Sequence, residues 1–178
     1  MGRYIRKPGE ARSWLAEGRL ALPNNVKKWV SPQFLNIGNK RVKAVSVLHP
    51  DGQVMNVSRM NQAGKKFRVE NLPADREIEY QSDVDNMADG IDKLELEDVR
   101  LAGKIKYPND RTIKTTYRMY DGLILDAEIF EDQANKFWGR FKATVDLGAS
   151  KEIRKETSLI TVSYTHLRAH ETLRSLVC

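Results

Sequence analysis

The chain has 178 residues, of which 40% are hydrophobic and 30% are charged, and its formal net charge is +6. This balance is typical of a globular protein of one domain or slightly more, and it excludes a fibrous or wholly disordered chain. No apolar run approaches the roughly 18 to 20 residues that a membrane-spanning helix needs, and the first ten residues lack the apolar core of a signal peptide. The single cysteine, Cys178, excludes an internal disulfide and a thiol zinc cluster.

Charge is distributed unevenly along the chain. Residues 1–43 carry ten Lys/Arg and two acidic residues, a net charge of +8, whereas residues 75–100 carry ten Asp/Glu and three Lys/Arg, a net charge of −7. A segment as basic as 1–43 could meet phosphate or an anionic lipid surface. We expect it instead to pair with the acidic stretch or to remain solvated.

The first 41 residues are predicted to form a basic leading segment, the end of a preceding unit that is truncated. Residues 3–22 predict a strand, a turn at Pro8-Gly9 and an amphipathic piece around Trp14-Leu15. The candidate contacts with an anion or a partner in this segment are Arg3, Arg6, Lys7, Lys27 and Lys28.

Residues 42–147 are predicted to form a β-β-β-α-β-β-β domain of the α+β class. Asp51-Gly52 and Asp121-Gly122 are each flanked by alternating apolar and polar residues, which is a strong local signal for a hairpin. A Lys-Phe pair follows each Asp-Gly at the same distance and ends at Phe67 and Phe137, so the two segments are offset by 70 residues throughout. The predicted architecture is two antiparallel three-stranded β-meanders related by an internal repeat, with each third strand starting at the Phe.

A helix is predicted between the two meanders, over about residues 81–94. Its apolar residues follow helical spacing, and Ser82 is expected to be the N-cap. The stripe consists of Val84, Met87, Ile91 and Leu94. Asp85, Asp89 and Asp92 are expected on the solvated face of this helix, because a calcium loop drawn through the same stretch would place Ala88 where glycine is required.

Residues 148–161 predict the start of a following unit that is truncated and that begins as a helix. Residues 162–178 contain the string VSYTHLRAHET, which resembles translated sequencing-adapter DNA, so we expect a non-native tail that packs poorly against the rest. The tail holds His166 and His170, which have the spacing of two metal ligands on one helix face, but we expect this spacing to be a coincidence of the adapter-like string. Outside the tail the sole histidine is His49, which we expect to be an exposed turn residue.

Two further groups of residues have chemical potential. Asp126 and Glu128 lie on one face of a predicted strand and could perform acid/base chemistry if burial separated their pKa values, but we expect this face to be solvated. The run KFWGRFK sets the cations Lys136, Arg140 and Lys142 among aromatic residues, a pattern that could stack on single-stranded nucleic acid. We expect instead a strand on which buried aromatic side chains alternate with exposed cations.

Another set of residues, spread from the N-terminus to the predicted helix, carries a family resemblance. The set comprises Trp14-Leu15, Leu22-Pro23, Trp29, Ile37, Arg41-Val42, Asp51-Gly52, Phe67, Leu72-Pro73, the helix from Val84 to Leu94, and Leu96-Glu97-Asp98-Val99. With these residues the chain resembles, over about residues 1–156, the bacterial family called domain of unknown function 4340. The resemblance implies a parent protein with an N-terminal membrane helix followed by repeated β-rich units outside the cytoplasm, in some cases encoded beside export-type ABC transporter components. It implies no catalytic, cofactor-binding or metal-binding residue.

We therefore expect a non-enzymatic, extracytoplasmic binding or scaffolding module, a fragment of a membrane-anchored bacterial envelope protein, with no cofactor. Its expected partners are envelope or ABC-transporter proteins, and its contact with the membrane is expected only through a helix of the parent protein. An alternative is a nucleic-acid or anionic-polymer binding module that uses the basic leading segment, with nucleic acid the less expected partner. A third possibility is a hydrolase that uses Asp126 and Glu128.

Overall fold

The computed structural model describes residues 2–18, 33–64, 66–92, 94–99, 105–162 and 167–169. Its strands are β1 Gly2–Ile5, β2 Trp14–Glu17, β3 Gln33–Leu35, β4 Val42–Leu48, β5 Val54–Ser58, β6 Arg68–Val69, β7 Leu94–Val99, β8 Ile113–Met119, β9 Leu123–Glu131, β10 Phe137–Val145 and β11 Leu167–Ala169. Its helices are the 3-10 turn η2 Asn39–Arg41, α1 Gln81–Asn86, the 3-10 turn η3 Met87–Ile91 and α2 Lys151–Val162.

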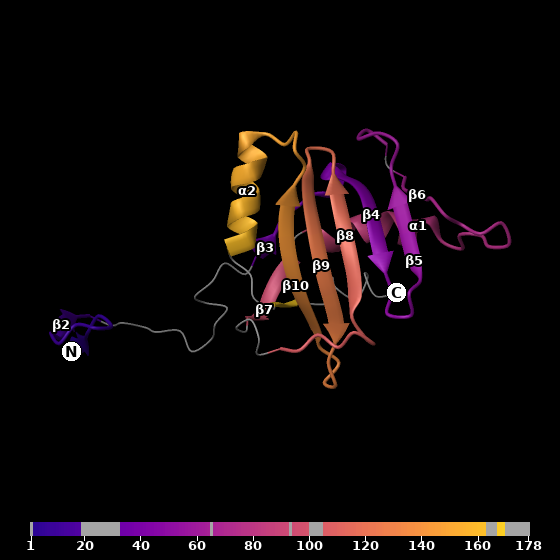
Figure 1. Cartoon of the computed structure of the whole chain (residues 1–178). Coiled ribbons are helices and arrows are strands. Elements are labelled where there is room, and N and C mark those ends of the chain that lie inside the picture. The colour runs from indigo at the N-terminus through magenta and orange to yellow at the C-terminus, as the bar shows by residue number, and fades with distance from the viewer. Residues whose placement is uncertain are drawn as a thin grey trace.

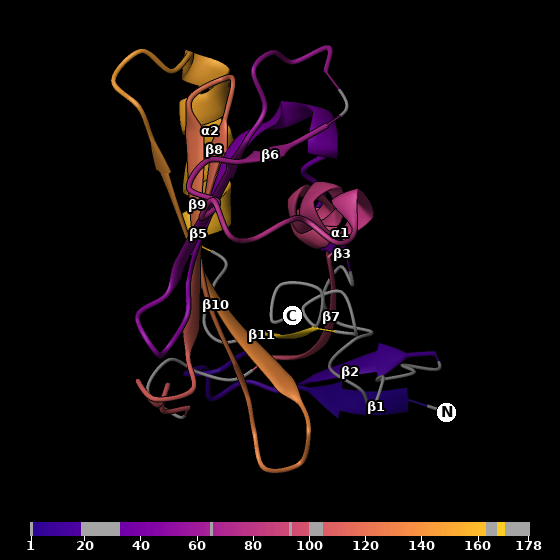
Figure 2. The ribbon, with the colours of Figure 1, turned by 90° about the vertical axis from the view of Figure 1, so that its right-hand side faces the viewer.

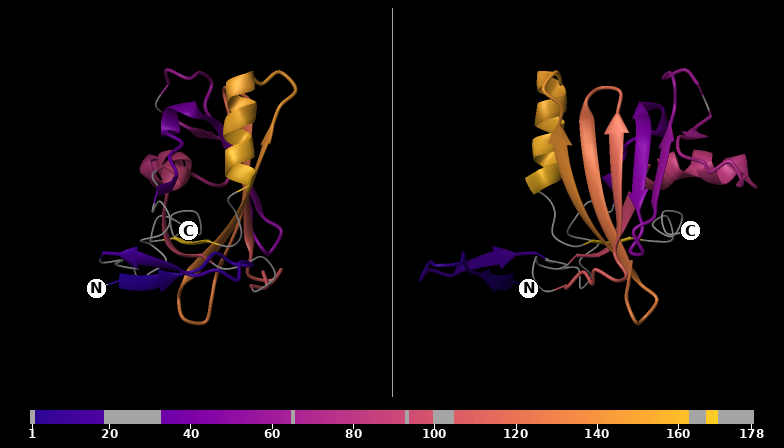
Figure 3. Two further views of the ribbon diagram at one scale, coloured as in Figure 1. Left: turned by 90° about the vertical axis from the view of Figure 1, so that its left-hand side faces the viewer. Right: turned by 45° about the vertical axis from the view of Figure 1, so that its right-hand side comes forward.

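Nine of these strands form one sheet in the order β3-β7-β11-β10-β9-β8-β4-β5-β6, and every neighbouring pair is antiparallel (Figure 1). β1 and β2 make a separate two-stranded hairpin, which lies away from the main sheet (Figure 3). With two short helical segments added to a mostly antiparallel sheet, the predicted α+β class is confirmed.

The sheet has one apolar face because its central strands alternate with a period of two residues. In β8, Ile113, Thr115, Tyr117 and Met119 are buried while Lys114 and Arg118 are exposed. The buried face packs against α1 and η3, which lie on one side of the sheet (Figure 2), and Ile160 of α2 joins the same core. The opposite face, here called the outer face, carries the charged side chains, as expected for an antiparallel sheet with one solvated side.

The two hairpin turns lie at the Asp-Gly pairs, and the same contacts form both of them. Gly52 and Gly122 have φ angles of 88° and 86°, in the left-handed region that glycine adopts without steric penalty. The carboxylate of Asp51 accepts a hydrogen bond from the Gln53 N–H (2.9 Å), and Asp121 accepts one from the Leu123 N–H (3.2 Å). Each aspartate therefore fixes its turn by bonding the backbone two residues ahead.

The helix between the hairpins differs from the prediction in its length and its cap. Tyr80, not Ser82, is the N-cap residue, and the α-helix ends at Asn86, where it tightens into η3. Asp92 is already extended (φ −82°, ψ 128°), because the chain must enter β7 at Leu94. The buried residues of α1 and η3 are Val84, Ala88, Gly90 and Ile91.

Side chains of α1 cover the free edge of the sheet beside β6. The carboxylate of Asp85 accepts a hydrogen bond from the Phe67 N–H (2.8 Å), and the Gln81 amide donates to the Phe67 carbonyl (2.9 Å). These two groups point away from β5 and would otherwise be open to pairing with another strand. Asp89 accepts a hydrogen bond from the Asn39 side chain (2.7 Å). Asp85 and Asp89, which were expected only to face solvent, therefore both bond to other parts of the chain.

Two arginines join distant parts of the chain. Arg41 donates to Asp121 in the β8–β9 turn (2.7 Å) and, in a bidentate pair, to Glu156 of α2 (2.9 and 3.0 Å). Arg59, only 4% exposed, donates to the backbone carbonyls of Gly64, Asn39, Lys40 and Val42. Its guanidinium lies over the ring of Phe67 (4.9 Å to the centroid), so the charge is held by carbonyl dipoles and an aromatic face.

Segments assigned to flanking units by the sequence contribute to the main sheet. β3 and η2 belong to the predicted leading segment, yet β3 pairs with β7. From the predicted non-native tail, the backbone of β11 pairs with both β10 and β7, which differs from the poor packing expected there. The rest of the tail from residue 163 onward, including His166, His170 and Cys178, lies outside the described residues.

Candidate functional site

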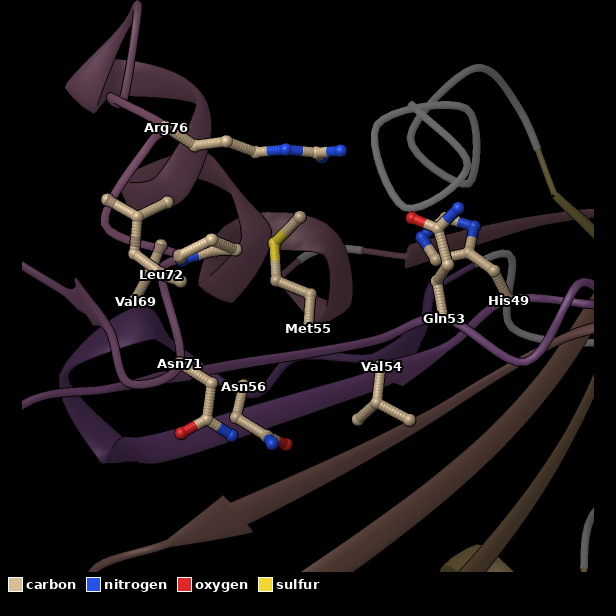
Figure 4. Close-up of a pocket in the computed structure, with 10 residues that line it drawn as sticks. His49, Gln53, Val54, Met55, Asn56, Val69, Asn71, Leu72 and Arg76 are labelled. Atoms are coloured by element: carbon tan, nitrogen blue, oxygen red, sulfur yellow. The ribbon is translucent and has the colours of Figure 1, made fainter.

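A pocket of about 370 Å³ lies at the β5 edge of the sheet, and we call it the edge pocket. Its lining residues are His49, Gln53, Val54, Met55, Asn56, Val69, Asn71, Leu72, Pro73 and Arg76 (Figure 4). They come from the β4–β5 turn, from β5, from Val69 of β6 and from the segment that leaves β6. The volume falls in the range of pockets that bind small ligands.

The edge pocket exists because β6 is too short to cover β5. Strand pairing ends at Val57↔Val69, and the last backbone contact is the hydrogen bond from the Glu70 N–H to the Asn56 carbonyl (2.8 Å). The chain then turns at Pro73, whose carbonyl accepts a hydrogen bond from the Arg76 N–H (3.0 Å). Proline has no backbone N–H to offer a neighbouring strand, so the strand cannot continue through it.

The floor of the edge pocket is apolar and its rim is polar. Val54 and Leu72 are 53% and 41% exposed, so aliphatic surface is open to solvent at this edge. Figure 4 shows the Arg76 side chain extending across the pocket toward the side on which His49 and Gln53 lie. Gln53 is held in place by Asp51, whose carboxylate accepts from its side-chain amide (2.9 Å).

This arrangement provides binding chemistry without a catalytic pair. The lining offers the guanidinium of Arg76, the imidazole of His49 and the amides of Asn56 and Asn71. It contains no serine, threonine, cysteine, aspartate or glutamate that His49 could activate or be oriented by. The predicted turn position of His49 is correct, but the residue is half-buried in the pocket wall rather than fully exposed.

Asp126 and Glu128 lie on the outer face, in a wider cleft of about 620 Å³ between β8, β9 and β10. Asp126 accepts a hydrogen bond from the Thr116 hydroxyl (2.7 Å), and Glu128 is bonded to the guanidinium of Arg140. Lys114 stands opposite Glu128 across the strand pair, so this carboxylate is flanked by cations on both sides. Each of the two carboxylates therefore has its own partner on a neighbouring strand.

The run from Lys136 to Lys142 presents its cations and buries its aromatics. Arg140 and Lys142 are exposed on the outer face, and Lys136 is half-buried at the β9–β10 turn. Trp138 and Phe141 are each 4% exposed, and the Trp138 indole donates to Asp132 (2.9 Å). Bases could not stack on rings that are already covered.

The described candidate cations of the leading segment, Arg3, Arg6 and Lys7, do not converge on either cleft. Arg3, Arg6 and Lys7 are exposed on the β1–β2 hairpin, and Lys27 and Lys28 lie outside the described residues. Tyr4, Ile5, Trp14 and Leu15 of the same hairpin are also at least 46% exposed. The β1–β2 hairpin, which carries Arg3, Arg6 and Lys7, lies away from the main sheet that contains β10 with Arg140 and Lys142 (Figure 3).

Within the described part of the chain, no three or more His, Cys, Asp or Glu side chains are grouped so that they could hold a metal ion. Nor does any described helix have the length and apolar character needed to cross a membrane.

Of the residues that line the edge pocket, only His49 was considered from the sequence as a possible site residue; Asn71, Leu72 and Arg76 were assigned no site role. A local signal for them was present, because Pro73 follows the third predicted strand of the first meander after only a few residues. The two-residue length of β6 and the resulting gap beside Val54 depend on three-dimensional pairing, which no local pattern encodes.

Comparison with known proteins gives one match. A family model described as a domain of unknown function, number 4340, matches residues 1–117, about two thirds of the chain. No curated protein and no solved structure matches the sequence.

Proposed function

Since the chain belongs to the family called domain of unknown function 4340, we propose that it is a non-enzymatic, extracytoplasmic binding or scaffolding module of the bacterial envelope, with the edge pocket as its ligand site. The envelope location and a role beside an ABC-type export system are what the family resemblance implies. The binding role is supported by the pocket itself, which combines an exposed apolar floor with a polar rim.

The observation that carries this proposal is the contrast between the two third strands. β10 has nine residues and pairs with β9 along its whole length, whereas β6 has two and leaves Val54 uncovered. Pro73 stands 70 residues before Ala143, a paired residue of β10. The first meander thus departs from the second at the place where the pocket opens.

We also propose that the two meanders are copies of one unit. The pairs Leu48↔Val54 and Arg118↔Ile124 correspond under the 70-residue offset, and α1 and α2 begin 70 residues apart, at Gln81 and Lys151. β4 pairs with β8 through Val45↔Tyr117 and Val47↔Thr115, two pairs that exchange under the same offset. This pattern is that of a two-fold axis at the pair Ser46↔Thr116.

The two copies differ in the register of the third strand. Val57 pairs with Val69 in the first copy, while Ala127 pairs with Phe141 in the second, a difference of two residues from the 70-residue offset. A shift by two residues keeps every side chain on the same face of the sheet, so the copies can diverge here without exposing their cores.

Nucleic-acid binding draws less support. The cations of β10 lie directly opposite carboxylates of β9, as in Arg140↔Glu128 and Lys142↔Asp126, and the Trp138 and Phe141 rings of β10 are buried. A phosphate backbone needs a continuous basic stripe, and a base needs a free aromatic face.

The binding proposal is tested by chemical-shift mapping of the ¹⁵N-labelled chain with a panel of small amphipathic probes: n-octanoate, 1-octanol, n-octylamine and a hydrophobic tripeptide. We expect at least one probe to shift amides of His49–Asn56 and Val69–Arg76 together. Shifts confined to the outer face, or none from any probe, would contradict the proposal. A fusion of the parent protein to alkaline phosphatase, which is active only outside the cytoplasm, tests the location separately.

A further inference from the structure

The lining of the edge pocket contains a positively charged side chain and no negatively charged one. Arg76 is its only charged residue, and neither aspartate nor glutamate is among the ten lining residues. The carboxylate of Asp51, in the adjoining β4–β5 turn, already accepts hydrogen bonds from the Gln53 backbone N–H and side-chain amide. An anionic group brought beside Arg76 would therefore meet a donor without displacing an existing ion pair of the described residues.

The remaining lining requires an apolar ligand body. Met55, Val69, Leu72 and Pro73 supply aliphatic surface on the same side of β5 as Arg76 (Figure 4), and Leu72 is among the more exposed large apolar side chains of the described residues. Covering such surface gives a favourable hydrophobic contribution. The volume of about 370 Å³ limits the ligand to a short chain or to a few side chains.

We infer that the edge pocket takes an amphipathic carboxylate, a ligand with one carboxylate on a short apolar body. Arg76 would hold the carboxylate through its two-pronged guanidinium, and the apolar floor would hold the body. Figure 4 shows the amides of Asn56 and Asn71 on the opposite side of β5 from Arg76, so Arg76, and not these amides, would hold the carboxylate. This inference rests on the proposed function, because it specifies the ligand of the same pocket.

Two natural sources share this chemistry: a fatty acid and the C-terminus of an apolar peptide. Titration calorimetry on the whole chain can separate them with matched probes. n-Octanoate is compared with 1-octanol and n-octylamine, and N-acetyl-Ala-Leu-Val with a free C-terminus is compared with the same peptide amidated. The tighter-binding carboxylate of the two series identifies the source.

We expect n-octanoate to bind more tightly than either 1-octanol or n-octylamine, or the free peptide more tightly than its amide. Arg76→Gln should reduce that affinity by about fivefold, the upper range for an exposed ion pair, and should abolish the preference over the neutral probe. The matched control is Arg111→Gln, an exposed arginine outside the pocket lining, which should leave the affinity unchanged.

Equal affinity for charged and neutral probes, with amide shifts still at the pocket, would overturn the carboxylate inference and leave the proposed function standing. No binding of any probe at the pocket would overturn both. If Arg76→Gln and Arg111→Gln weaken binding equally, the effect is one of net charge, and the role assigned to Arg76 is wrong.

Discussion

Replacing Arg59 by methionine should cost the fold about 3–5 kcal/mol of unfolding free energy, because the guanidinium holds two loops against the sheet. The Val42 carbonyl, which accepts at 2.7 Å, is fully buried and would lose its partner at a cost of about 1–3 kcal/mol. The carbonyls of Asn39, Lys40 and Gly64 are partly buried, so water can replace the guanidinium there at a smaller cost.

The cation–π contacts of Arg59 with Phe67 and Tyr120 add about 0.5–2 kcal/mol, part of which the methionine side chain retains as apolar packing. Arg59→Lys keeps the charge but loses the planar fork, so we expect it to lose about 2 kcal/mol. Urea unfolding followed by circular dichroism measures these changes. The control, Arg118→Met, removes an exposed arginine of the outer face and should stay within about 0.5 kcal/mol of the parent chain.

The outcome that would refute this reasoning is a loss below about 1 kcal/mol for Arg59→Met with an unchanged denaturant slope. Such a result would mean that water satisfies the carbonyls of the 39–42 turn as well as the guanidinium does. A loss equal to that of Arg118→Met would point to charge alone, not to the buried contacts.

Three further predictions concern the edge, the turns and the core. The double substitution Gln81→Ala and Asp85→Ala uncovers the Phe67 N–H and C=O, so sedimentation velocity should show concentration-dependent association that the control Ser82→Ala lacks; a monomer at all concentrations would contradict the capping role. Gly52→Ala and Gly122→Ala should each lower the unfolding free energy by about 1–2 kcal/mol, because both glycines have positive φ; an effect at one turn alone would argue against equivalent hairpins. Burial raises the pKa of the Tyr117 hydroxyl far above its ordinary value. The unfolded chain therefore loses this proton at about pH 10, whereas the folded chain retains it to higher pH. The free energy of unfolding should accordingly be highest below about pH 10 and should fall as the pH rises further. Tyr117→Phe should lessen that alkaline fall at little cost at pH 7, since the hydroxyl makes only a 3.4 Å contact with the Met87 carbonyl; an unchanged alkaline slope would show that Tyr117 does not contribute to it.

The features that the sequence predicts well are those encoded by neighbouring residues. Asp51-Gly52 and Asp121-Gly122 specify their turns through positive φ and a carboxylate that bonds two residues ahead, so both turns could be located without a structure. The apolar stripe predicted for the helix is buried at Val84 in α1 and at Ile91 in η3, but its last residue, Leu94, belongs to β7, since pairing with β3 overrides the helical period there.

Neither the burial of Arg59 nor the edge pocket could be predicted, because both depend on contacts that no local pattern contains. Arg59 is buried because carbonyls from residues 39 to 42 and Gly64 converge on it, which alternation along β5 does not reveal. The edge pocket likewise follows from the early end of pairing between β5 and β6. Sequence patterns instead indicated Asp126, Glu128 and the Lys136–Lys142 run. The carboxylates of Asp126 and Glu128 are hydrogen-bonded to neighbouring side chains, and the Trp138 and Phe141 rings of the run are buried.

The central claim is that the edge pocket is the ligand site, and Leu72→Asp tests it most directly. Leu72 is 41% exposed, so the substitution should leave the urea midpoint nearly unchanged while placing a carboxylate in the apolar wall beside Arg76. We predict that calorimetry will show at least about tenfold weaker binding of n-octanoate, from lost apolar contact and added like-charge repulsion. Unchanged affinity in a folded Leu72→Asp chain would contradict the claim and place the ligand elsewhere on the molecule.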